Sequence, residues 1–180
     1  MWLTVDYLTR IISLGMVAYA LFKGMLHPSR LYLKPLPIMP LIGYTLLLTL
    51  PGVWMIHGIE VGLKELSDAT KLATFPKITR PWAEYMDLSF GLMLVAVSEE
   101  IIFRSLFYDL FHKRLSTSGL VLASACFFAL IHWGMGADTV IGAFAWAVLA
   151  MGVFIRIRSV YPLILGHFLV NLVLFSGVLG

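Results

Sequence analysis

This chain has few charged residues and almost no cysteine, and each shortage excludes a class of protein. Asp, Glu, Lys and Arg make up 13% of its 180 residues, whereas 60% are apolar and the mean hydropathy is +0.92. Soluble domains carry about 25% charged residues. The composition therefore excludes a soluble globular domain and predicts a polytopic membrane protein. Cys126 is the only cysteine, so an intrachain disulfide and a Cys-rich metal site are both excluded.

The chain also lacks internal repeats, low-complexity tracts and polar linkers that would separate domains. A membrane-spanning helix needs about 20 predominantly apolar residues, and six segments approach that length: about 3–26, 37–57, 87–111, 118–134, 139–156 and 160–178. We therefore expect an all-α bundle of about six transmembrane helices that forms one domain over residues 1–180. The stretch 58–84 is the one long loop, with a short interfacial helix expected before Pro76.

The distribution of basic residues says more about partners than the net charge of +3 does. The first, third and fifth loops hold Lys and Arg with almost no acids, whereas residues 58–84 mix both signs. The positive-inside rule then places both termini outside, and nothing indicates a nucleic-acid partner. In the first segment, Asp6 and Arg10 argue against a cleavable signal peptide, and their i, i+4 spacing is typical of a structural ion pair.

Ionisable and amide side chains inside the apolar segments are the strongest functional signal. An isolated charge at the centre of a bilayer costs about 2.5–3.5 kcal/mol or more, so such residues indicate a site. The residues concerned are Glu99, Glu100, Arg104, His132, His167 and Asn171.

The two adjacent glutamates cannot serve the same helix face, because neighbouring helical residues point about 100° apart. Glu100 and Arg104 have the i, i+4 spacing of an ion pair with the acid on the favourable N-terminal side. Glu99 has no partner on its own helix and is expected to point toward other helices. Desolvation there would suit it to act as a general base.

Three further polar residues lie on two other expected helices. His132 ends one segment, one turn after Phe128, and His167 and Asn171 are separated by one turn in the last segment. Together with Glu99 they could converge on one water molecule and supply a base, an imidazole and oxyanion donors for peptide hydrolysis. A proton-coupled transporter and a non-enzymatic scaffold or immunity protein stay open as alternatives.

These motifs resemble those of a known family. Glu99-Glu100-x-x-x-Arg104, Phe128-x-x-x-His132 and His167-x-x-x-Asn171, in this order, resemble the three signatures of the CPBP intramembrane proteases, which include type II CAAX prenyl endopeptidases and bacterial Abi proteins. The resemblance covers about residues 84–178. It implies that Glu99 and His132 activate water, that His167 and Asn171 bind the oxyanion, and that Glu100 and Arg104 form a structural pair.

The resemblance leaves two questions open, the metal and the substrate. Glu99, His132 and His167 could hold a zinc ion, but this would consume the best general base, so we favour a reaction without metal or other cofactor. The chain is shorter than the eight-span prenyl endopeptidases. We expect a small bacterial member in the plasma membrane, whose partners are the lipid bilayer and a membrane-associated protein or peptide substrate.

Overall fold

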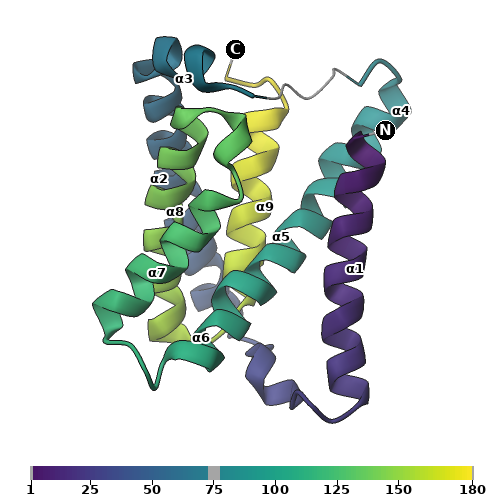
Figure 1. The fold of residues 1–180 in the computed structure, drawn as a ribbon, viewed down its shortest axis with the longest axis vertical. Coiled ribbons are helices and arrows are strands. Elements are labelled where there is room, and N and C mark those ends of the chain that lie inside the picture. The colour runs from purple at the N-terminus through teal and green to yellow at the C-terminus, as the bar shows by residue number, and fades with distance from the viewer. Residues whose placement is uncertain (1, 73–77, 180) are drawn as a thin grey trace.

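Helices make up most of the described chain in the computed structural model, which describes residues 2–72 and 78–179 (Figure 1). In order they are α1 (Trp2–Phe22), η1 (Pro28–Leu31), α2 (Ile38–Gly62), α3 (Lys64–Thr70), α4 (Pro81–Met86), η2 (Asp87–Gly91), α5 (Leu92–Glu100), η3 (Ile101–Leu106), α6 (Phe107–Phe111), α7 (Thr117–Leu130), η4 (Trp133–Met135), α8 (Ala137–Ile157) and α9 (Tyr161–Phe175). The described residues contain no strand, which confirms the all-α fold class.

Each of the six predicted segments corresponds to helical structure. Among the described residues, α1, α2 and α8 are long and apolar enough to cross a membrane, whereas α7 and α9 are apolar but shorter. The segment 87–111 is one continuous helix in which η2 and η3 are π-helical. The number of spans stays a prediction. In the stretch 58–84, α3 confirms the expected short helix, while Pro76 lies outside the described residues.

The core of the bundle lies where α2, α7, α8 and α9 pack together (Figure 1). Two glycines let α2 approach its neighbours closely. A Cβ atom at Gly52 would lie 2.7 Å from the Trp146 ring, and one at Gly166 would lie 2.7 Å from Cβ of Leu48. Small residues at such contacts are how membrane helices gain van der Waals packing, because lipid gives them no hydrophobic drive to associate.

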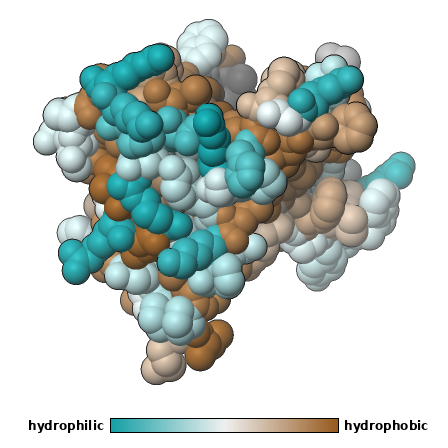
Figure 2. Space-filling view, turned by 90° about the horizontal axis from the view of Figure 1, so that it is seen from below, coloured by the Kyte–Doolittle hydropathy of each residue, from teal (hydrophilic) through white to brown (hydrophobic). Residues whose placement is uncertain are grey.

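Two other features of the arrangement matter for the site. Helix α1 stands apart from the core and packs against α5 (Figure 1), and none of its described side chains is buried. Figure 2 views the end of the molecule that holds η1 and α6, and hydrophilic side chains gather there. Lys23, Arg30 and Lys113 are exposed in the loops at this end, which we call the basic end.

The close approach at Gly52 generates the first prediction. Gly52→Ala should lower the free energy of unfolding by about 1–3 kcal/mol, the usual cost of overpacking a close-packed contact. The control is Gly152→Ala in α8, where an added Cβ has open space around it and should not destabilise. Thermal unfolding of both variants in the same detergent measures the difference. Equal stabilities would contradict the packing described for α2.

Candidate active site

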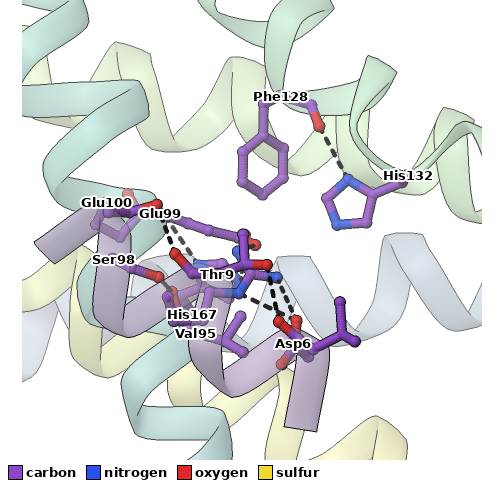
Figure 3. A network of polar contacts seen from close by, with 12 residues as sticks. Asp6, Thr9, Val95, Ser98, Glu99, Glu100, Phe128, His132 and His167 are labelled. Atoms are coloured by element: carbon purple, nitrogen blue, oxygen red, sulfur yellow. Dashed lines mark hydrogen bonds and ion pairs between the residues drawn. The ribbon is translucent and has the colours of Figure 1, made fainter. Parts of the chain in front are cut away.

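The polar site is built around the C-terminal end of α5. Glu99 and Glu100 are its last residues, with exposed fractions of 1% and 0%. Because they are adjacent on a helix, their carboxylates diverge, as expected from the sequence. Glu100 contacts Arg104 and α9, whereas Glu99 contacts α1 (Figure 3).

Glu100 holds two partners. Its Oε2 lies 3.2 Å from Nε of Arg104 in the ion pair that the i, i+4 spacing predicts, and its Oε1 lies 2.9 Å from Nδ1 of His167. The Arg104 side chain is fully buried, and its guanidinium lies 4.4 Å from the ring centroid of Phe128 and 5.1 Å from that of Trp146. The buried cation is therefore balanced by one carboxylate and two aromatic faces.

Glu99 is not without a partner, and the sequence-based expectation missed this contact. Its Oε1 accepts a hydrogen bond from Nη1 of Arg10 on α1. Arg10 also contacts Asp6, the neighbour predicted from spacing, at 3.2 Å. The missed contact joins residues 89 positions apart, and helical spacing gives no information on such pairs. Only the position of a charged Arg10 in an apolar segment could have drawn attention to it.

The second oxygen of Glu99, Oε2, is buried and lacks a hydrogen bond among the described residues, as do Oε2 of Glu100 and the three guanidinium nitrogens of Arg104. Nε2 of His167 lies 3.8 Å from Oε2 of Glu99. This separation is too long for a direct hydrogen bond and suits a bridging water. A buried carboxylate oxygen without a hydrogen bond among the described residues is consistent with a bound water or a catalytic role.

His167 joins the two glutamates and its tautomer follows from its neighbours. The Glu100 carboxylate, paired with Arg104, can only accept hydrogen bonds, so Nδ1 of His167 carries the proton between them. The ring is held by Trp146, at a centroid separation of 4.7 Å. Nε2 is thereby directed toward Glu99 (Figure 3).

The other two predicted residues lie close by without joining this network. His132 follows the end of α7, and its Nδ1 lies 2.9 Å from the Phe128 carbonyl oxygen. The Phe128 ring lies between the histidines, with centroid separations of 5.0 Å to His132 and 5.9 Å to His167. Asn171 lies one turn beyond His167 on α9, is half-buried, and has no side-chain hydrogen bond among the described residues. Its role stays a prediction.

The same geometry bears on the zinc alternative. Within residues 2–72 and 78–179, no three His, Cys, Asp or Glu side chains are grouped so that they could share a metal ion. Glu99 faces Arg10, and Nδ1 of His167 faces Glu100. The set Glu99, His132 and His167 does not fit a three-ligand site as arranged.

The Glu100–Arg104 pair generates a prediction on stability. Removing either partner leaves an uncompensated buried charge, so Glu100→Gln and Arg104→Gln should each cost about 3–5 kcal/mol of unfolding free energy. The double variant should recover part of that loss, because two amides can hydrogen-bond across one turn. A double-mutant cycle by thermal unfolding in detergent measures the coupling.

The control pair is Arg30 and Asp109, which lie 3.2 Å apart with Arg30 54% exposed. Their coupling should stay below about 1 kcal/mol, as for other exposed pairs. If Glu100 and Arg104 prove independent while Glu99 and Arg104 couple strongly, the two glutamates have exchanged roles.

Comparison with known proteins agrees with the motifs. No curated protein and no solved structure matches the chain significantly. The family of type II CAAX prenyl endopeptidase Rce1-like proteins matches residues 81–173, just over half of the chain. The match begins at α4 and includes all six residues singled out in the apolar segments, while Arg10 and the rest of α1 lie outside it. This integral membrane protein belongs to the type II CAAX prenyl endopeptidase Rce1-like family of proteases.

Proposed function

We propose that this chain is an intramembrane endopeptidase that hydrolyses a peptide bond with a water molecule activated by Glu99. The observation that carries the proposal is the free Oε2 of Glu99, a buried carboxylate oxygen facing Nε2 of His167 across 3.8 Å. A water between these atoms would lie beside a base and an imidazole at once. Family membership supports the reaction class, and this geometry supports the choice of residues.

In the proposed reaction, Glu99 takes a proton from the water as its oxygen attacks the carbonyl carbon of the scissile bond. The carbonyl oxygen becomes an oxyanion and accepts hydrogen bonds from Nε2–H of a protonated His167 and from the Asn171 amide. When the intermediate collapses, the C–N bond breaks and Glu99 passes its proton to the leaving amine. His132 assists by orienting the water.

Three carboxylates and two guanidiniums lie around the site of this step, namely Asp6, Glu99 and Glu100 with Arg10 and Arg104. Glu100 also contacts His167. Glu100 then has a positioning role, because its contact with Nδ1 fixes the ring orientation.

A glutamate mechanism fits these contacts better than a zinc mechanism does. Zinc would require Glu99 to leave Arg10 and His167 to turn away from Glu100. It would also leave the reaction without a free general base. The substrate we propose is a membrane-associated protein or peptide, and the compartment a bacterial plasma membrane.

A transporter and a scaffold are the competing functions. Transporters of this kind place the site between internal repeats, and the sequence shows none. A scaffold or immunity protein has no need for an unpartnered carboxylate oxygen at a depth where it is costly.

Glu99→Gln tests the proposal. It should lower peptide-bond hydrolysis by at least about 100-fold, because the amide keeps the shape but cannot accept the proton. Mass spectrometry of membrane-protein termini, in cells with the wild type and with Glu99→Gln, measures the loss and names the substrate. The matched control is Glu84→Gln, at an exposed position in α4. This variant should leave the termini of the membrane proteins as they are in cells with the wild type. Unchanged termini in a folded Glu99→Gln variant would exclude the mechanism.

The metal preference has a separate test. Purified active protein should contain no stoichiometric zinc by elemental analysis, and prolonged chelation should leave turnover intact. The protein used for this measurement must show an activity that Glu99→Gln abolishes. One zinc per chain, whose removal and return switches the activity off and on, would reverse the preference.

A further inference from the structure

Helix α3 lies against the start of α8 and against η4 (Figure 1), and its one buried residue is a serine. Ser67 has an exposed fraction of 1%, whereas every other residue of α3 is exposed, including Leu66 at 50%. A buried hydroxyl costs free energy unless it is hydrogen-bonded. Polar contacts, rather than the burial of apolar side chains, therefore fix where α3 lies.

One buried hydrogen bond joins α3 to α8. The Ser67 hydroxyl donates it to Oδ1 of Asp138, a residue in the first turn of α8 that is 5% exposed. Gly136 precedes α8 with a φ of +115°, a conformation that is strained for residues other than glycine. A Cβ atom at Gly136 would also lie 2.5 Å from the Ser67 hydroxyl oxygen and 2.7 Å from Oδ1 of Asp138. The backbone at Gly136 therefore leaves the space that this hydrogen bond occupies.

Two more hydrogen bonds extend the contact along the same segment. The Thr70 hydroxyl oxygen accepts one from the Ala137 N–H at 2.9 Å. Leu72, just beyond α3, donates its N–H to the carbonyl oxygen of Gly134 at 3.1 Å. We call these two bonds and the Ser67 bond the α3 contact. It holds three positions, 134, 137 and 138, that closely follow His132 in the chain.

His132 lies in the turn between α7 and α8, outside both helices. Within the turn, its N–H donates to the Ala129 carbonyl oxygen at 3.0 Å, and its own carbonyl oxygen accepts from the Met135 N–H at 2.9 Å. Its ring is held through Nδ1, 2.9 Å from the Phe128 carbonyl oxygen. Because the chain runs directly from His132 into the residues that α3 holds, the place of α3 contributes to the place of the imidazole.

We propose that Ser67 and Asp138 are positioning residues for His132, and that α3 thereby sets the place of the imidazole that orients the attacking water. The proposal rests on the proposed function, in which His132 assists Glu99. Neither Ser67 nor Asp138 takes a proton or touches the substrate in this role. Helix α3 precedes residues 81–173, which match the family, whereas His132 and Asp138 lie within them. A segment outside the family match thus supports a site inside it.

The first test needs no substrate. Ser67→Ala should raise amide hydrogen exchange in residues 131–138 by about tenfold, because the segment loses a buried hydrogen bond that restrains it. Ser67 and Asp138 line a cavity of about 270 Å³, so water can hydrate the Asp138 carboxylate and the variant should still fold. Mass spectrometry of the protein in detergent measures the exchange. Equal exchange in the wild type and in a folded Ser67→Ala variant would overturn the proposal.

The matched control is Ser159→Ala. It removes another buried serine hydroxyl, which donates to the Lys34 carbonyl oxygen at 2.6 Å. This contact follows the last turn of α8, toward the basic end, whereas the Ser67 contact is at the first turn. Ser159→Ala should therefore leave exchange in residues 131–138 at the wild-type rate. Faster exchange there in both variants would mean a general loosening of the fold and would overturn the role of α3.

The second test separates a positioning role from a purely structural one. For the protein whose terminus depends on Glu99, Ser67→Ala should lower kcat about tenfold and keep KM within about twofold, because a displaced group slows the chemical step more than binding. Asp138→Asn keeps an oxygen that accepts from Ser67 and should retain the wild-type kcat, whereas Asp138→Ala should match Ser67→Ala. Equal losses in Asp138→Asn and Asp138→Ala would overturn the hydrogen bond as the cause.

The outcomes distinguish this inference from the proposed function. Faster exchange in Ser67→Ala with an unchanged kcat would overturn the positioning role while Glu99-dependent cleavage by the wild type stands. If the wild type itself lacks Glu99-dependent cleavage, the proposed function fails. Faster exchange confined to Ser67→Ala would then still support the placement of His132 by α3.

Discussion

The burial of Arg104 is the constraint on which the rest of the site depends. A guanidinium with no exposed surface must be balanced locally, and here Glu100 and the faces of Phe128 and Trp146 do so. These three residues come from α5, α7 and α8, so one charge holds three helices in fixed positions. Glu100 in turn fixes His167 on α9. The geometry around Glu99, the proposed catalytic base, thus depends on a neighbouring pair to which we assign no part in the reaction.

The features that depend on local periodicity could be predicted from the sequence. Helix content, the six apolar segments and the Glu100–Arg104 pair all follow from hydrophobic runs and i, i+4 spacing. The carboxylates of Glu99 and Glu100 diverge because successive residues of a helix point about 100° apart. His167 could be expected in the same cluster, because polar side chains inside apolar helices are costly unless they contact one another.

Features that depend on how distant helices meet could not be predicted. The contact of Arg10 with Glu99 joins the first helix to the third predicted segment, and nothing in either segment encodes which face of α1 meets α5. The i, i+4 spacing predicted that Arg10 pairs with Asp6. It does, but Arg10 also pairs with Glu99, which the spacing did not predict. The π-helical turn η3 is also invisible in the hydropathy pattern, although it lies immediately after Glu100.

The burial of the site determines how water must reach it. Glu99 is the last but one residue of α5, and His132 lies in the turn after α7. Hydrolysis consumes one water per bond cut. Because Glu99 is 1% exposed and its Oε2 is buried, the proposed reaction requires a path by which water reaches this site.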